Sequence, residues 1–197
     1  MSRVIHVFRT PDRFIAGTVG QPGERAFYLQ AVQEARIVSV LLEKQQVQVL
    51  SERIGALLEE VARRFGADIP EATEDVGDLY PLSTPVEEEF RVGTMGLGWD
   101  SEASAVVVEL LAATDTEVDE SVVLDDTDEG PDAVRVFLSP EQAREFAARS
   151  ERVLSAGRLP CPLCGEALDP AGHVCIRTNG YRRGVGISRS ASEPDES

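Results

Sequence analysis

The chain has 197 residues, a net charge of −16 and a hydrophobic fraction of 42%. These values predict a globular protein with one sizeable domain and a small appendage. A strongly negative chain is repelled by nucleic-acid phosphates, which argues against nucleic-acid binding. No apolar run approaches the length of a membrane span and no signal-peptide pattern is present, so we expect a cytoplasmic protein.

The first third of the chain predicts four strands followed by a long helix. The strands are expected over residues 4–8, 14–20, 26–32 and 37–42, and the helix over residues 43–65, with Gly66 as its stop. Six apolar residues of the helix recur at steps of three and four: Val47, Leu50, Ile54, Leu57, Leu58 and Val61. This spacing is typical of a helix that packs one face against a core. His6 lies in the apolar first strand, so we interpret it as a core or edge histidine rather than a general base.

Two acidic connectors follow. Residues 67–88 contain three prolines, which predicts an ordered surface connector pinned by Tyr80, Leu82 and Val86. Residues 113–132 contain many Asp and Glu residues and no base, and we expect a solvated loop with a short strand over residues 122–124. A calcium site is not expected there, because the loop lacks the alternating ligands and terminal glutamate of an EF-hand.

The second half of the body repeats the order of elements of the first. Strands are expected over residues 90–96, 105–111 and 133–138, and a helix over residues 139–156. That helix carries a start signal, with Ser139 suited to the N-cap and Pro140 and Gln142 to the first turn.

A shared heptapeptide indicates that the two halves are an internal duplication. The pattern F-x-x-G-T-[VM]-G occurs at residues 14–20 and again at residues 90–96, before the same order of elements. We therefore predict an α+β domain over residues 1–157, made of two β-β-β-α halves, residues 1–66 and 86–157. The sheet is expected to be mainly antiparallel, with two long helices. The alternative is chance similarity between two amphipathic hairpins.

Two halves packed about a pseudo-twofold axis would create a crevice, which is a common location for a ligand. Thr18, Thr94 and Trp99 are the residues expected to line it. Glycines at positions 17, 20, 93 and 96 would let a ligand or another backbone approach closely. The competing interpretation is that these glycines mark bulges or strand ends.

All three cysteines and one of the two histidines fall within fifteen residues: Cys161, Cys164, His173 and Cys175. Three thiolates and one imidazole complete a tetrahedral ligand set, which predicts a structural zinc ion with no position for a catalytic water. The appendage, residues 158–183, has little apolar core, so the metal would supply its folding energy. The alternatives are three unrelated reduced cysteines, or a disulfide with one free thiol.

The segment after these cysteines is basic and contains an Asn-Gly turn. The residues expected to contact a partner are Arg177, Asn179, Tyr181, Arg182 and Arg183. An aromatic ring beside guanidinium groups suits a phosphate or an acidic protein, and it could equally dock on the acidic body of the same chain. Residues 184–197 are expected to be a disordered tail.

The run R-x-P-C-P-L-C-G-x-x-L-D-P-x-G-H-x-C-x-R-x-N-G-Y-R-R, with the F-x-x-G-T-[VM]-G strand before it, resembles an uncharacterised actinobacterial family, domain of unknown function 3090. The resemblance covers residues 1–183, which is all but the tail. It implies a cytoplasmic protein of high-GC Gram-positive bacteria, and it assigns no activity and no catalytic residue.

Catalytic motifs are missing from the sequence: it contains no P-loop, no nucleophile elbow and no dinucleotide-binding turn. We therefore expect a non-enzymatic interaction or adaptor protein with a protein partner. The alternative is an enzyme or small-ligand binder that uses the crevice. Nucleic-acid binding through the appendage has the least support, because five arginines oppose a net charge of −16.

Overall fold

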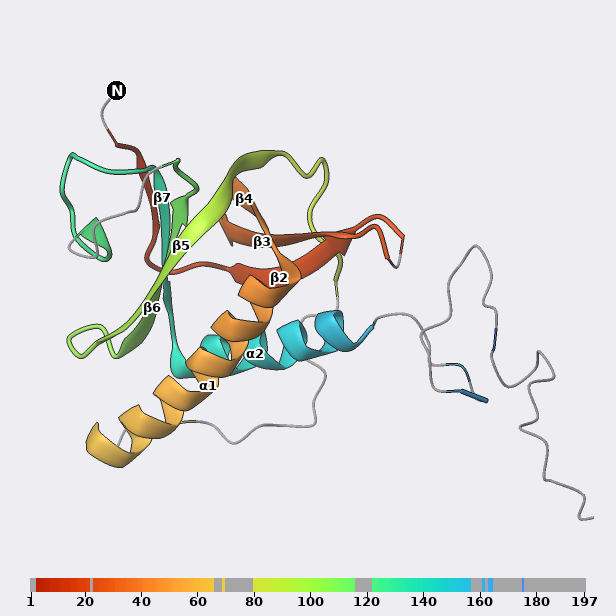
Figure 1. The fold of residues 1–197 in the computed structure, drawn as a ribbon. Coiled ribbons are helices and arrows are strands. Elements are labelled where there is room, and N and C mark those ends of the chain that lie inside the picture. Colours follow the sequence, from red (N-terminus) through yellow and green to blue (C-terminus); the bar gives the residue numbers. More distant parts are fainter. Residues whose placement is uncertain are drawn as a thin grey trace, which may run out of the picture. The chain divides into compact units, whose positions relative to one another are not determined.

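The chain divides into two units, residues 1–157 and residues 158–197. The computed structural model describes residues 3–21, 23–65, 69, 80–115, 122–156, 161, 163, 164 and 175. The strands of the first unit are β1 (Ile5–Phe8), β2 (Arg13–Val19), β3 (Ala26–Gln33), β4 (Arg36–Leu42), β5 (Glu88–Asp100), β6 (Ala105–Ala112) and β7 (Ala133–Leu138) (Figure 1). Its helices are α1 (Lys44–Phe65) and α2 (Pro140–Ser155).

The strands form one sheet in the order β1-β7-β6-β5-β4-β3-β2. Four neighbouring pairs are antiparallel, while β1 with β7 and β4 with β5 are parallel. Each half contributes a three-stranded antiparallel meander, β2-β3-β4 or β5-β6-β7, and the two meanders join where β4 pairs with β5. The fold is therefore α+β with a mixed sheet.

The leading strand pairs with the second half, although we had expected it to extend the first. β1 runs parallel to β7, with Ile5 opposite Ala133 and Phe8 opposite Val136. The main-chain hydrogen bond from Ala133 N to Val4 O (2.9 Å) continues this pairing. An apolar run predicts that a strand exists, but it does not identify the strand that pairs with it.

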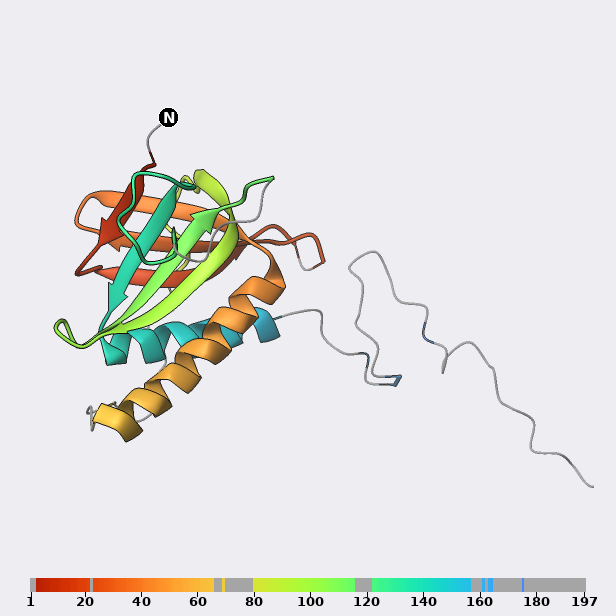
Figure 2. The same cartoon turned by 60° about the vertical axis from the view of Figure 1, so that its left-hand side comes forward.

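Both helices lie on the same face of the curved sheet (Figure 2). Five of the six residues of the predicted stripe of α1 are at most 2% exposed: Val47, Leu50, Ile54, Leu58 and Val61. The sixth, Leu57, is half-buried and packs against the core. The predicted start of α2 is confirmed, because Ser139 and Gln142 form a reciprocal capping box. On the inner face of α2, Phe146 stacks on Phe14 of β2 with ring centroids 4.8 Å apart. The core therefore lies between the helices and one face of the sheet.

The described parts of the two connectors contact the opposite face of the sheet, and one buried polar side chain holds each of them. In β3, the amide of Gln30 accepts a hydrogen bond from Ser83 N (2.8 Å) and donates one to Ser83 O (3.1 Å). In β6, the carboxylate of Glu109 accepts a hydrogen bond from Leu124 N. Both side chains are fully buried, and each lies on the central strand of its meander.

One glycine of each heptapeptide is approached closely by a side chain of a connector. A Cβ atom at Gly17 would lie 2.5 Å from Leu82 Cγ, and one at Gly96 would lie 2.4 Å from Val123 Cγ1. Leu82 is buried and pins the first connector as predicted. The side chain of Tyr80 does not, because it is 77% exposed. The space beside Gly17 and Gly96 is thus filled by the chain itself.

Residues 122–124 form a turn, so the predicted short strand is wrong. Leu124 has a left-handed backbone conformation (φ 63°), and its N–H binds the side chain of Glu109 rather than a neighbouring strand. The run of three consecutive apolar residues was too short to separate a strand from a turn that inserts its side chains.

The two heptapeptides occupy different positions in their hairpins. β2 ends one residue before Gly20, which starts the turn, whereas β5 continues four residues beyond Gly96, to Asp100. When the hairpins are aligned at their turns, Phe14 corresponds to Met95, five residues beyond the sequence match. The heptapeptide is therefore not the element that relates the two halves.

Candidate metal centre

The three cysteines of the chain come together in the second unit. The sulfur atoms of Cys161, Cys164 and Cys175 lie within 4.8 Å of one another, and Cys161 Sγ is 3.9 Å from Cys175 Sγ. Leu163 and Cys164 form a turn, which lets two cysteines three residues apart direct their sulfurs to one point. The structure thus brings together three of the four residues that the sequence predicted as metal ligands.

The separation of the sulfurs suits a shared metal ion. Two thiolates bound to one tetrahedral zinc ion at about 2.3 Å lie about 3.8 Å apart, close to the 3.9 Å between Cys161 and Cys175. A disulfide would require about 2.05 Å between the sulfurs, and none of the three cysteines forms one. Three thiolates held this closely repel one another unless a cation lies between them. This set of donors could therefore hold a metal ion.

The remaining residues predicted for this unit lie outside the described residues. They are His173, the expected fourth ligand, and the expected partner contacts Arg177, Asn179, Tyr181, Arg182 and Arg183. The predicted tail, residues 184–197, also lies outside them. Their roles stay predictions.

The three cysteines differ in their access to solvent. Cys161 and Cys175 are each 6% exposed, whereas Cys164 has intermediate exposure. A metal ion at this point would be shielded from water by two of its ligands. This favours a metal that stabilises local structure over one that activates a water molecule.

The residues predicted to line a crevice are spread over the sheet. Thr18 lies near the end of β2, and Thr94 and Trp99 lie in β5. β3 and β4 separate these two strands. All three side chains are half-buried, and Trp99 packs against the core. The structure therefore does not bring Thr18 next to Thr94 by strand pairing.

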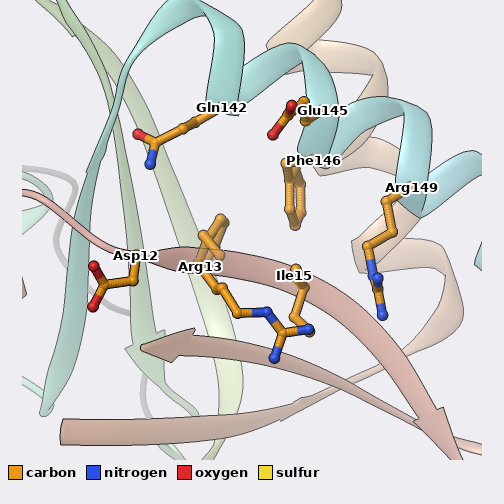
Figure 3. Close-up of a pocket in the computed structure, with 8 residues that line it drawn as sticks. Asp12, Arg13, Ile15, Gln142, Glu145, Phe146 and Arg149 are labelled. Carbon is orange, nitrogen blue, oxygen red and sulfur yellow. The ribbon is translucent and has the colours of Figure 1, made fainter. Parts of the chain in front are cut away.

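A pocket that the sequence did not predict lies between β2 and α2 (Figure 3). It is lined by Asp12, Arg13, Phe14, Ile15, Gln142, Glu145, Phe146 and Arg149. Arg149 donates hydrogen bonds to Ala16 O at the edge of β2 (2.8 Å) and to Tyr80 O (2.7 Å), and Arg13 also binds Tyr80 O (3.2 Å). These guanidinium groups attach the first connector to the edge of the sheet.

A buried ionic cluster surrounds Glu109 in β6. Arg135 of β7 donates two hydrogen bonds to Glu109 Oε1 (2.9 and 2.7 Å), and Arg3 Nη2 lies 3.6 Å from the same oxygen. Burial opposes the charge of Arg135, but the hydrogen bonds to Glu109 and Asp126 outweigh it and raise the pKa of Arg135. Arg135 therefore stays charged at every physiological pH. A Glu and an Arg within apolar strands were the sequence signal for this cluster, and sequence reasoning missed it.

His6 is an edge histidine, as predicted. It lies in β1 at one end of the sheet and is half-buried. Its Nε2 lies 3.2 Å from Glu89 Oε1, which gives the ring a polar partner.

The comparisons with known proteins concern the family of the chain. No helix in the described part of the chain is long and apolar enough to cross a membrane. No curated protein and no solved structure matches the chain. One family model does match, over residues 6–175, a range that includes the sheet, both helices and all three cysteines. The chain therefore belongs to the family described as Protein of unknown function (DUF3090).

Proposed function

We propose that the chain is a non-enzymatic interaction protein whose C-terminal unit is held together by one structural zinc ion. The observation that carries the zinc site is the set of three thiols within 4.8 Å of one another. Cys161, Cys164 and Cys175 would supply three ligands and His173 the fourth. This set fills a tetrahedral zinc ion and leaves no position for water, so the metal would stabilise the unit rather than catalyse a reaction.

Metal analysis of the purified protein tests the site. We expect about one zinc ion per chain for the wild type, as one tetrahedral site requires. The two histidines of the chain provide a matched pair of variants. His173→Ala should lower the zinc content or the zinc affinity, whereas His6→Ala, in β1 of the first unit, should leave both unchanged. A wild-type protein that binds no zinc, or equal losses in both variants, would refute the proposed ligand set.

The interaction role is supported by the uneven charge of the two units. Residues 1–157 contain 30 acidic and 14 basic side chains, whereas residues 158–197 contain five of each, and the five arginines all lie within residues 158–189 beside only two acidic residues. A basic segment beside a zinc-stabilised turn suits an acidic protein surface. We propose Arg177, Asn179, Tyr181, Arg182 and Arg183 as the contact. The negative charge of the first unit opposes nucleic acid as a partner.

Two pairs of adjacent arginines allow a controlled test of this contact. A protein partner recovered from host extract should be lost with Arg182→Ala/Arg183→Ala. It should be retained with Arg63→Ala/Arg64→Ala, since this second pair is exposed at the end of α1. If both double variants lost the partner equally, net charge alone would explain the binding. If both retained the partner, the proposed contact would be excluded.

We propose a cytoplasmic location and an actinobacterial source. Three cysteines without a disulfide suit a reducing compartment. Lys44 is the single lysine among 19 basic residues, a bias that suits GC-rich coding. Fractionation of host cells with an antibody against the chain tests the location, and recovery in the membrane or secreted fraction would contradict it.

We also propose that the two halves of the first unit arose by duplication. Both halves have the same strand order and direction, and each is followed by a helix on the same face. With the hairpins aligned at their turns, Gln30 corresponds to Glu109, and each holds the connector that covers its half. In an experimental structure, superposition of the halves should place Gln30 on Glu109. A different residue at that position would contradict the duplication.

The alternative function, an enzyme or small-ligand binder, has less support. The connectors occupy the space beside Gly17 and Gly96, and Thr18 and Thr94 lie on strands that are not neighbours. Thermal shift of the purified protein against a metabolite panel tests this alternative. A stabilising ligand whose effect disappears in Thr94→Val or Trp99→Leu would promote it over the interaction role.

A further inference from the structure

We propose that Cys164 is a modification site for hydroperoxides, and that its oxidation converts the thiol cluster into a disulfide that no longer holds metal. The inference rests on the proposed zinc site and adds a redox response to it. It starts from an asymmetry in the cluster, since Cys164 has intermediate exposure while Cys161 and Cys175 are each 6% exposed.

We expect Cys164 to be oxidised first, because it is the most solvent-exposed of the three cysteines. The thiolate, and not the thiol, is the form of cysteine that attacks an oxidant, and metal ligation keeps cysteine sulfurs in the thiolate form. When sulfurs share this form, susceptibility to oxidation follows exposure. Of the three cysteines, Cys164 is the residue with the most surface exposed to solvent.

The first step forms a sulfenic acid. The Cys164 sulfur attacks one oxygen of hydrogen peroxide, the O–O bond breaks, and hydroxide leaves. The sulfur is oxidised, and the peroxide, supplied as co-substrate, is reduced.

The second step uses a neighbouring thiol of the cluster. Cys161 and Cys175 both lie within 4.8 Å of Cys164, so either can attack the sulfenic sulfur with little movement. A sulfur–sulfur bond forms, the sulfur–oxygen bond breaks, and the oxygen leaves as water. In total, two thiols and one peroxide molecule give one disulfide and two water molecules.

The disulfide removes two of the ligands that the metal needs. One thiolate would remain with His173, and two ligands cannot complete a tetrahedral site. Zinc would therefore leave the oxidised chain, and the fold of the second unit would be weakened with it. Reduction of the disulfide would restore the site.

The experiment treats the full-length, zinc-loaded protein with hydrogen peroxide in small steps. Released zinc is measured with a chromogenic chelator, free thiols by titration, and the modified residue by mass spectrometry with a sulfenic-acid trap. Because the chain has only three cysteines, the thiol count reports on this cluster alone. We expect about one zinc ion released for every two thiols lost. The first adduct should be on Cys164, and dithiothreitol should restore zinc binding.

Three outcomes would overturn the inference. One is oxidation of Met95, the half-buried methionine of β5, while zinc and all three thiols are retained. Another is a first adduct on Cys161 or Cys175. The third is loss of zinc that dithiothreitol does not reverse. A protein that binds no zinc before peroxide is added would instead refute the proposed metal site, and trapping on the metal-free chain would still identify the first sulfur to react.

Discussion

The two halves of the sheet hold their connectors with different chemical groups. Each has an outer face covered by a connector, and each holds that connector from a fully buried position on its central strand. In the first half Gln30 does so with a neutral amide that binds Ser83 and the hydroxyl of Ser39. In the second half Glu109 does so with a carboxylate that also requires Arg135 and Arg3.

The difference between Gln30 and Glu109 shows that a buried charged group needs more partners than a buried neutral one. A buried amide is satisfied by a few hydrogen bonds, while a buried carboxylate needs positive partners because its desolvation is far more costly. The arginines need acceptors in turn. Arg3 donates to the carbonyl oxygens of Pro131 (2.9 Å) and Asp125 (3.1 Å), and Arg135 donates to that of Asp125 (2.9 Å). The second connector is therefore organised around two guanidinium groups, and the first around one amide.

The largest expected effect comes from removing the charge of Glu109. Glu109→Gln keeps the shape and the acceptor for Leu124 N, but it removes the buried carboxylate that Arg3 and Arg135 share and leaves Arg135 with the exposed carboxylate of Asp126. We expect a loss of about 3–5 kcal/mol in the free energy of unfolding, measured by urea denaturation. Glu102→Gln, in the exposed turn between β5 and β6, is the control and should change it by less than about 0.5 kcal/mol. A loss below about 1 kcal/mol for Glu109→Gln would mean that the cluster is not the anchor of this half.

A smaller loss in the free energy of unfolding is expected in the first half, where the neutral amide of Gln30 holds the connector. Gln30→Leu leaves the N–H and the carbonyl of Ser83 without their side-chain partner, which should cost about 1–3 kcal/mol. Hydrogen exchange at the Ser83 amide should speed up in the same variant. Gln45→Leu, on the exposed face of α1, provides the matched control. If Gln30→Leu cost as much as Glu109→Gln, the distinction between the two anchors would be wrong.

The smallest effect should come from the exposed edge of the ionic cluster. Asp126 pairs with Arg135, but its side chain is 84% exposed. Water screens such a pair, so Asp126→Asn should lower the free energy of unfolding by at most about 1 kcal/mol, and less at high salt. A larger loss would place Asp126 among the groups that hold the second connector.

Local features of the fold were predictable because local patterns determine them. The stripe of α1 and the capping box at Ser139 depend on residues at most four positions apart, and both are confirmed. The pairing of β1 with β7 was not predictable, since it joins residues about 128 positions apart. The heptapeptide match misled us for the same reason, because register is set by the turn and by pairing across the sheet.

The candidate metal centre was predictable in part. Spacing alone identified Cys161, Cys164 and Cys175, and the structure brings their sulfurs together. The difference in exposure between Cys164 and the other two required the folded chain. The buried partners of Glu109 were hidden because sequence gives no sign that Arg3 and Arg135, so far apart in the chain, meet at one carboxylate.

The parallel pairing of β1 with β7 also has a consequence for synthesis on the ribosome. Residues 5–8 emerge long before their partner, because the strand that pairs with them ends at Leu138. At about 5–20 residues per second, the nascent chain carries an unpaired N-terminal strand for roughly 6–25 s. During this interval its apolar edge is open to other strands, so β1 is where binding by a chaperone would protect the chain most.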